Sequence, residues 1–254
     1  MSTKKQVVIG IVNSKGGSGK STLVVQLAIA FNKKLHKKVL VVDVDDQGSS
    51  INWFERYRPE NRAGVSAIHL SARYLKSQLR VISKGFDVVI IDSKGSRDKA
   101  VADVVSTEVI THSDFSVVPL VPAVFDEMAM DDFMRDVVEP LAKVKEIRLG
   151  VLLNRIKNVR SVKVFQKYLR DLDLPCFDNE VPEAATFTNG LGSGQACFEY
   201  DTKGKATLKF LAFFKELCDH LGVKKDGEKE SSRTTKNKPS TPRKKRNAGS
   251  EHRI

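Results

Sequence analysis

Residues 7–22 read Val-Val-Ile-Gly-Ile-Val-Asn-Ser-Lys-Gly-Gly-Ser-Gly-Lys-Ser-Thr, and this stretch decides the fold. An apolar run leads into a glycine-rich loop, and Lys-Ser-Thr then opens a helical pattern. Glycines let backbone N–H groups curve around a polyphosphate, and the positive end of the following helix points at the same anion. We expect Lys20 to reach the β- and γ-phosphates of a nucleotide and the Ser21 hydroxyl to bind Mg²⁺. The order of strand, loop, Lys-Ser and helix favours a phosphate-binding loop over an ordinary glycine-rich turn.

The composition suits one α/β domain followed by a basic tail. The chain has 254 residues, of which 41% are apolar, and this suffices for a sizeable core. The formal net charge is +12, and residues 224–254 hold eleven Lys or Arg against four Asp or Glu. Because this tail has almost no aliphatic side chains, we expect a folded domain over residues 1–223 and a disordered basic segment over residues 224–254.

The sequence lacks the features of membrane and secreted proteins. No apolar run reaches the about eighteen residues that a spanning helix needs. The first residues show no apolar segment with a cleavage site. The three cysteines are widely spaced and odd in number, which indicates reduced thiols. We therefore expect a cytoplasmic protein.

Apolar runs alternate with helical patterns along the chain. The runs are rich in Val and Ile and nearly continuous, which is typical of parallel strands covered on both faces. They span residues 7–13, 38–45, 86–92, 115–122 and 147–154. Helical patterns span residues 21–35, 124–145, 161–172 and 205–221. This alternation predicts a doubly wound, mostly parallel sheet with helices on both faces.

Acidic residues end two of the expected strands. Asp43 and Asp45 close the run at 38–45, and Asp92 closes the run at 86–92. Ligands of open α/β sheets bind at the carboxyl ends of the strands, so these acids are expected beside the phosphate-binding loop. An acid that merely caps a strand end is the alternative, and the loop upstream favours the functional interpretation.

The run from Lys15 to Ser21 resembles the deviant phosphate loop (deviant Walker A motif) of the ParA/MinD class of P-loop NTPases, and the similarity extends over about residues 6–222. The resemblance implies ATP and Mg²⁺ as cofactors and a homodimer that sandwiches two nucleotides. It implies that Lys15 reaches the partner's phosphates in trans, and that Asp45 positions the attacking water. It assigns the metal end of the site to Ser21, Asp43 and Asp92. The loop residues that would cradle the nucleotide are Lys15, Gly16, Gly17, Ser18, Gly19, Lys20, Ser21 and Thr22.

Other positions match the family less closely. Asp46 stands where the family has proline, and Lys94 follows the strand that ends at Asp92. Lys94 could contact a phosphate, an acid of a partner or solvent, and we expect it to face solvent. The resemblance carries Asn154 and Pro182 over as adenine contacts, although Asn154 could equally cap a loop.

Two basic segments are candidate DNA contacts. The first has residues spaced to share one face of a helix, whereas its apolar residues lie on another face. The alternative for such a face is simple solvation. The members of the first segment are Arg160, Lys163, Lys167 and Arg170, and those of the second, in the tail, are Arg243, Lys244, Lys245 and Arg246.

The resemblance as a whole implies a ParA-type partition ATPase. Such a protein hydrolyses ATP slowly, binds nucleoid DNA without sequence preference as a dimer, and is stimulated by a centromere-binding, ParB-like adaptor. The basic tail lacks the apolar face of a MinD-like membrane helix, so we expect no membrane partner. Two alternatives stay open: an ATP-binding scaffold with negligible turnover, and a positioning protein for another cargo, such as a chemoreceptor cluster or a carboxysome.

Overall fold

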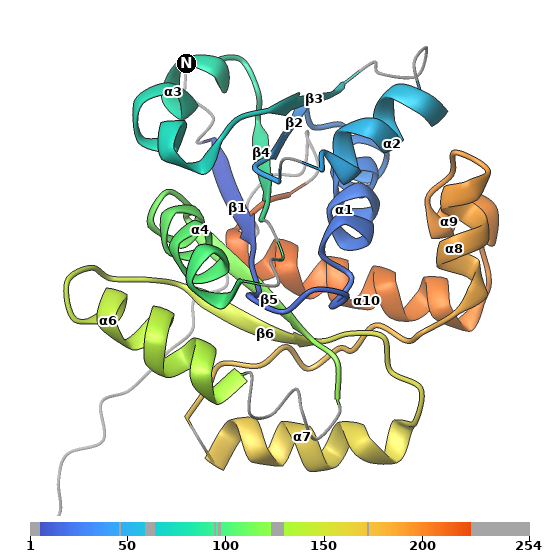
Figure 1. Cartoon of the computed structure of the whole chain (residues 1–254). Coiled ribbons are helices and arrows are strands. Elements are labelled where there is room, and N and C mark those ends of the chain that lie inside the picture. Colours follow the sequence, from blue (N-terminus) through green and yellow to red (C-terminus); the bar gives the residue numbers. More distant parts are fainter. Residues whose placement is uncertain are drawn as a thin grey trace, which may run out of the picture.

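The computed structural model describes residues 6–224 except 46, 59–63, 94, 96–97, 123–129 and 172, and for residues 159–161 it describes the backbone only. Six strands form one parallel sheet in the order β3-β2-β4-β1-β5-β6 (Figure 1). The strands are β1 (Val7–Ile11), β2 (Val39–Asp43), β3 (Val65–His69), β4 (Val88–Asp92), β5 (Phe115–Leu120) and β6 (Leu149–Leu153). Because all six run the same way, their carboxyl ends share one edge of the sheet.

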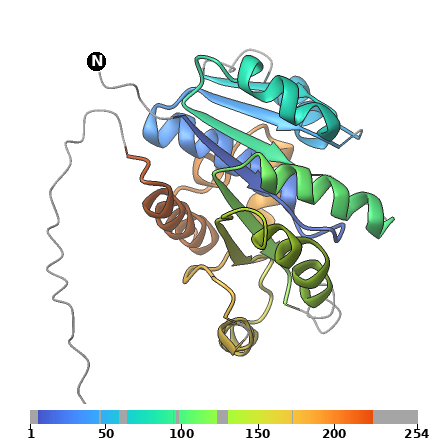
Figure 2. The same ribbon diagram turned by 90° about the vertical axis from the view of Figure 1, so that its left-hand side faces the viewer.

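The helices cover both faces of this sheet (Figures 1 and 2). One apolar core joins the sheet to α1 (Lys20–Leu35), α2 (Ser49–Tyr57), α8 (Ala185–Gly192), α9 (Cys197–Tyr200) and α10 (Lys205–Leu221). Aromatic side chains of α10 contribute much of this core, and Phe210 and Phe213 are fully buried. This core holds α1, the helix that follows the glycine-rich loop, rigidly against the sheet.

The second core lies on the opposite face. It joins the sheet to α3 (Leu75–Ile82), α4 (Lys99–Thr111), the π-helical turn η2 (Met134–Val138) and α7 (Val159–Asp171). The short 3₁₀ turn η1 (Ala72–Tyr74) precedes α3, and α6 (Glu139–Ala142) follows η2. The strands contribute alternate residues to the two cores, which is why their sequences read as continuous apolar runs.

The predicted doubly wound sheet is confirmed, with all five predicted strands at slightly shorter bounds. Strand β3 is a further strand that the pattern did not predict, because it is only half-buried and its apolar run is interrupted by Ser66 and His69. The helix expected over 205–221 has those bounds, and α1 and α7 begin one and two residues before the predicted starts. Of the helix expected over 124–145, the described part runs over residues 130–142 and includes the π turn η2.

The described chain ends just after α10. Gly222 adopts a left-handed conformation (φ 66°) that stops the helix, and Lys224 is the last described residue. The remainder of the expected basic tail, including Arg243 to Arg246, lies outside the described residues. Within the described part of the chain, no helix is both long and apolar enough to cross a membrane.

Candidate functional site

The glycine-rich loop connects β1 to α1 at the carboxyl edge of the sheet. Gly17 (φ 79°) and Gly19 (φ 88°) both adopt left-handed backbone conformations, which glycine tolerates without strain. A Cβ on Gly19 would also lie 2.7 Å from Asn154 Nδ2. Helix α1 starts directly after Gly19, whose position as N-cap supplies no side chain to cap the first N–H groups. The loop therefore presents backbone donors and a helix N-terminus to the same space.

The two lysines of the loop occupy different environments. Lys20 is buried, and its Nζ donates a hydrogen bond to the carbonyl oxygen of Lys15 at 3.0 Å. Burial lowers the pKa of Lys20, and the charges of Asp92 and Asp45 oppose that shift. Lys15 is exposed, and its backbone N–H donates to Asn13 Oδ1 at 2.8 Å. Lys20 thus faces the inside of the site, whereas Lys15 lies at the surface of the molecule.

A cavity of about 350 Å³ lies over this loop, and it brings most of the predicted phosphate-binding residues together with Asp45. The segment after β4 closes one side, because a Cβ on Gly95 would lie 3.0 Å from Lys20 Nζ and 3.1 Å from Gly16 Cα. The lining residues are Gly16, Gly17, Gly19, Lys20, Ser21, Thr22, Asp45, Ser93, Gly95 and Arg155. Asp46 and Lys94, the two departures from the family pattern, lie outside the described residues.

Asp43 ends β2 and is fully buried. Its Oδ1 accepts the Asp45 N–H at 3.0 Å, and its Oδ2 accepts the N–H and hydroxyl of Ser50 at 3.0 and 2.7 Å. Both carboxylate oxygens therefore hold the turn that enters α2. Asp45, two residues further along, lines the phosphate cavity and accepts the Gln47 N–H at 3.1 Å.

Asp92 ends β4 in register with Asp43 on the neighbouring strand. It is 1% exposed, and neither of its oxygens has a hydrogen-bond partner among the described residues. Burial, reinforced by the Asp43 charge, raises its pKa to about 7, and the nearby hydroxyls of Ser21 and Ser50 offset part of the shift. A buried carboxylate without a partner beside a hydroxyl suits Mg²⁺, which takes few protein oxygens and otherwise binds water and phosphates. Within the described chain, no group of three or more His, Cys, Asp or Glu side chains is arranged to hold a metal ion by itself.

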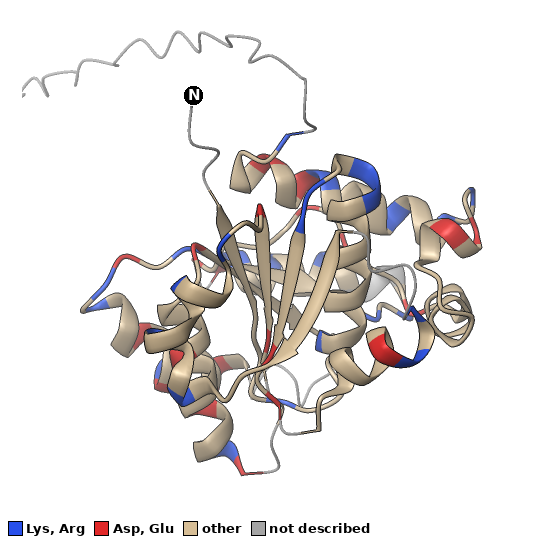
Figure 3. Cartoon of the chain, turned by 90° about the horizontal axis from the view of Figure 1, so that it is seen from above, with Lys and Arg blue, Asp and Glu red and all other residues tan. Residues whose placement is uncertain are grey.

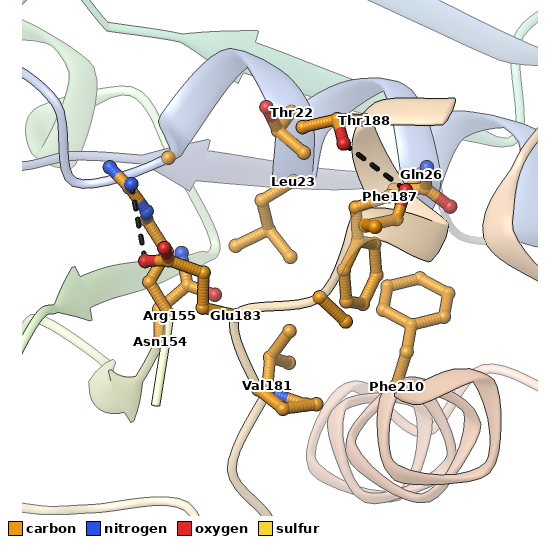
Figure 4. Close-up of a pocket in the computed structure, with 14 residues that line it drawn as sticks. Thr22, Leu23, Gln26, Asn154, Arg155, Val181, Glu183, Phe187, Thr188 and Phe210 are labelled. Atoms are coloured by element: carbon orange, nitrogen blue, oxygen red, sulfur yellow. Dashed lines mark hydrogen bonds and ion pairs between the residues drawn. The ribbon is translucent and has the colours of Figure 1, made fainter. Parts of the chain in front are cut away.

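A second cavity, of about 510 Å³, adjoins the first and shares Gly19, Thr22 and Arg155 with it (Figure 4). Apolar side chains from α1, α8 and α10 line one side, and the segments after β6 line the other. The lining residues are Gly19, Thr22, Leu23, Gln26, Asn154, Arg155, Val181, Pro182, Glu183, Ala184, Ala185, Phe187, Thr188 and Phe210. A polar cavity beside one with an apolar wall and several polar groups suits a nucleotide, with the phosphates in the first and the base in the second.

The predicted base contacts Asn154 and Pro182 both line this second cavity. Asn154 is buried, and its Nδ2 donates to the Ser18 carbonyl oxygen at 2.8 Å. In this arrangement the Asn154 side chain holds the glycine-rich loop while forming part of the cavity wall. The hydrogen bond from Asn154 to Ser18 is therefore the kind of contact expected if Asn154 caps a loop.

Arg155 is a site residue that the sequence reasoning did not assign. It adopts a left-handed conformation (φ 54°), which is uncommon for a residue other than glycine. Its Nη1 donates to the Gly17 carbonyl oxygen at 2.8 Å, and its Nη2 lies 3.2 Å from Glu183 Oε2 (Figure 4). Arg155 thus spans the junction of the two cavities. Its place directly after Asn154 at a strand end was the available signal.

Helix α7 carries the predicted basic face. Lys163, Lys167 and Arg170 are exposed, whereas Phe165 and Leu169 are buried against the sheet. Arg160 lies in the same helix, and the structure describes its backbone only. Among the side chains that the structure describes, the exposed residues of α7 are thus these three basic residues, Val164 and Asp171.

Comparisons with known proteins agree with this geometry. A family model described as the CobQ/CobB/MinD/ParA nucleotide binding domain matches residues 9–196. Two proteins named "Maintenance of carboxysome distribution protein A" are similar. The Gloeobacter kilaueensis protein is 30% identical over 84% of this chain and 93% of its own. The Halothiobacillus neapolitanus protein is 22% identical over 81% and 93%.

Solved structures share the fold. The ATP complex of a McdA variant from Cyanothece has a TM-score of 0.69 at 17% identity, covering 88% of this chain and 99% of its own. The septum site-determining protein MinD from Pyrococcus horikoshii OT3, solved with Mg-ADP, has a TM-score of 0.65 at 18% identity, covering 87% and 100%.

Proposed function

Because this chain belongs to the CobQ/CobB/MinD/ParA family of nucleotide-binding domains, we propose that it is an ATPase that positions a cargo by cycling on nucleoid DNA. Nucleotide binding is supported by the pair of adjoining cavities, with the glycine-rich loop and Lys20 in one and a larger space with apolar and polar walls in the other. The names of the two curated relatives support a positioning role.

The loop and its lysines divide the work on the nucleotide. Backbone N–H groups of residues 16–19 and the start of α1 bind the phosphates, and the Lys20 ammonium supplies the positive charge inside the cavity. Lys15 is exposed at the surface of its own subunit, and in the ATP-bound dimer it reaches the phosphates of the second subunit. Closure of the dimer would then depend on the γ-phosphate.

Ser21 and Asp92 would hold Mg²⁺ beside the phosphates. When bound, Mg²⁺ would neutralise part of the phosphate charge that develops during transfer to water. Asp45 lines the same cavity, and its backbone N–H is fixed by Asp43. We assign Asp45 to orienting the attacking water, and Asp43 to holding Asp45 and α2 in place rather than to binding the metal directly.

The cargo is proposed to be a protein assembly of the carboxysome type, reached through an adaptor. The curated relatives at 22% and 30% identity are named for carboxysome distribution, and this favours the positioning alternative over DNA segregation. The exposed basic face of α7 would bind DNA phosphates in the ATP-bound dimer, because two weak basic faces joined rigidly gain effective concentration. Nucleoid association in the cytoplasm follows from this proposal.

The test combines turnover with cargo imaging. Phosphate release is measured for the full chain with Mg-ATP, with DNA, and with candidate adaptors encoded beside its gene. In the native host, the gene is deleted and fluorescent markers follow carboxysome-like assemblies and plasmids. Mispositioned assemblies with stable plasmids support the proposal. Plasmid loss with normal assemblies supports segregation, and ATP binding without stimulated phosphate release supports the scaffold with negligible turnover.

A further inference from the structure

A basic cluster lies at the edge of the sheet opposite the nucleotide cavities. It consists of Lys33, Lys34, His36 and Lys38, at the end of α1 and the start of β2, together with Lys84 in the turn before β4; we call it the amino-edge cluster. All five of these residues are exposed. Residues 33–42 and 70–86 contain no Asp or Glu, so neither contributing segment carries its own counter-charge.

The backbone brings the two segments together. The Lys38 carbonyl oxygen accepts the N–H groups of Asp87 and Val88 at 2.9 and 3.1 Å, and Asp87 Oδ2 accepts the Lys38 N–H at 2.8 Å. The turn that carries Lys84 therefore lies next to Lys38. An open hollow of about 470 Å³ adjoins the cluster, lined by Asn32, Lys33, His36, Lys37, Lys38 and Gly64.

The lysine ammonium groups of the cluster have no carboxylate partners among the residues that the structure describes. No ion pair joins Lys33, Lys38 or Lys84 to an acid of that part of the chain. Lys34 lies over the Phe198 ring at 4.6 Å. The acid that follows the turn, Asp87, accepts the Lys38 backbone N–H. Lys37 is buried and is not part of the cluster.

Stabilisation of the helix dipole explains only part of this arrangement. Lys33 and Lys34 lie in the last turn of α1, where cations interact favourably with the helix carbonyl end. Lys38 and Lys84 lie outside any helix, so this explanation does not extend to them. Cations held close together without carboxylate partners among the described residues repel one another, and a chain of phosphates would relieve that repulsion.

The end of the described chain lies beside the cluster. Burial raises the pKa of Cys218 in α10 to about 12, and the nearby Lys37 charge offsets part of that shift, so this end of α10 lies close to the 33–38 segment. Figure 3 shows the basic segment between α1 and β2 beside the end of α10. Residues 224–254, which hold eleven Lys or Arg, continue from this point.

We propose that the amino-edge cluster is a second contact surface for the phosphate backbone of double-stranded DNA, separate from α7 and insensitive to the bound nucleotide. Lysines act as point charges on phosphates and need no base-specific geometry, so the contact is independent of sequence. The cluster lies at the edge away from the glycine-rich loop, so closure over ATP does not alter it. The binding of DNA by this cluster can be tested by itself. Only its role in the cell rests on the proposed association of the protein with the nucleoid.

The experiment measures binding of the full chain to a short fluorescent DNA duplex by anisotropy, across NaCl concentrations and with Mg-ADP present. The test variant is Lys33→Gln/Lys38→Gln/Lys84→Gln. The matched control is Lys143→Gln/Lys203→Gln/Lys205→Gln, which removes the same charge from exposed positions elsewhere. A third variant replaces the same three cluster lysines by Arg. Thermal unfolding and binding of a fluorescent ATP analogue verify that each variant is folded.

We expect the slope of log affinity against log salt to shrink by about 0.9 for each DNA phosphate that is no longer neutralised, hence by about 2–3 in the cluster variant. At about 0.1 M salt the affinity should fall roughly tenfold or more, the control should follow the wild type, and the Arg variant should keep the wild-type slope. Equal decreases in affinity for the cluster and control variants, or an unchanged cluster variant, would overturn the proposal.

Anionic lipid vesicles serve as a second probe of the same variants. A cluster variant that binds the vesicles more weakly while its DNA binding is unchanged would overturn the proposal as well. If the proposed function is wrong, DNA binding by the wild-type protein would show no preference for ATP over ADP. The measurement described here uses Mg-ADP alone, so its outcome does not depend on that preference.

Discussion

Replacing Asp92 by Asn should stabilise the nucleotide-free protein at neutral and alkaline pH. The pKa of Asp92 rises from its ordinary 3.8 to about 7 through burial and the neighbouring Asp43. Between these two values the unfolded chain ionises Asp92 and the folded chain does not, so the free energy of unfolding falls as pH rises through this window. About three pKa units correspond to about 4 kcal/mol, fully expressed above about pH 7.

The variant avoids this cost because the amide is neutral at every pH. An unpartnered buried amide costs about 1–3 kcal/mol, which leaves a net gain of roughly 1–3 kcal/mol at about pH 8. For a chain of this length such a gain raises the melting temperature by about 2–10 °C. Near pH 4 the wild-type carboxyl is neutral too, so the gain should vanish or reverse there.

Circular dichroism melts of wild type and Asp92→Asn in EDTA, at several pH values between about 4 and 8, provide the measurement. Glu146→Gln, which neutralises an exposed carboxylate, is the control and should show no growing difference. A difference between Asp92→Asn and wild type that does not increase with pH would refute the assigned cause. The same variant should lose the Mg²⁺-dependent part of nucleotide binding. Undiminished Mg²⁺ dependence would remove Asp92 from the metal site.

Four further sets of substitutions test the rest of the site. Lys20→Ala should abolish binding of a fluorescent ATP analogue, whereas Lys15→Ala should bind it and fail to dimerise with ATP; a normal ATP dimer by light scattering would disprove the trans role. Asp45→Ala should retain ATP and trap the dimer, with phosphate release reduced about 10²-fold or more; unchanged stimulated turnover would move the role elsewhere. Arg155→Ala, which removes the contacts to Gly17 and Glu183, should weaken nucleotide binding about tenfold, as measured by titration and as expected from the loss of about 1.4 kcal/mol; unaltered affinity would make Arg155 a structural residue. Charge reversal of the α7 basic face should abolish the preference of DNA binding for ATP over ADP, and a variant that still discriminates would exclude α7 as the switchable surface. The residues reversed to Glu are Arg160, Lys163, Lys167 and Arg170.

The sheet was predictable because its central strands are buried on both faces. Five nearly continuous apolar runs are typical of parallel strands covered on both faces, and the glycine-rich loop identified the first run as the strand that precedes the phosphate-binding loop. Strand β3 was not predicted because, unlike the other edge strand β6, it is only half-buried, so Ser66 and His69 are tolerated there. Helix α4 was not predicted because its exposed face carries Val101 and Val104, which weaken the contrast between an apolar and a polar face in its sequence.

The loop residues were predictable for a different reason. Their spacing is local, since glycines, Lys20 and Ser21 act through backbone that adjoins them in sequence. Arg155 was not predictable in the same way, because its contacts with Gly17 and Glu183 join segments separated by many residues. The amino-edge cluster was also hidden, since Lys84 reaches Lys38 only through the pairing of β4 with β2.

Asp43 and Asp92 occupy equivalent positions at strand ends but differ in their hydrogen-bond partners, and this difference separates their roles. Both are buried aspartates at paired register positions on adjacent parallel strands, and the sequence alone assigned both to the metal. The Asp43 oxygens accept three hydrogen bonds from Asp45 and Ser50 and hold the entry to α2. The Asp92 oxygens accept none from the described residues. Ionising Asp92 is therefore unfavourable until a cation arrives, and a site of this kind couples Mg²⁺ binding to release of a proton near neutral pH.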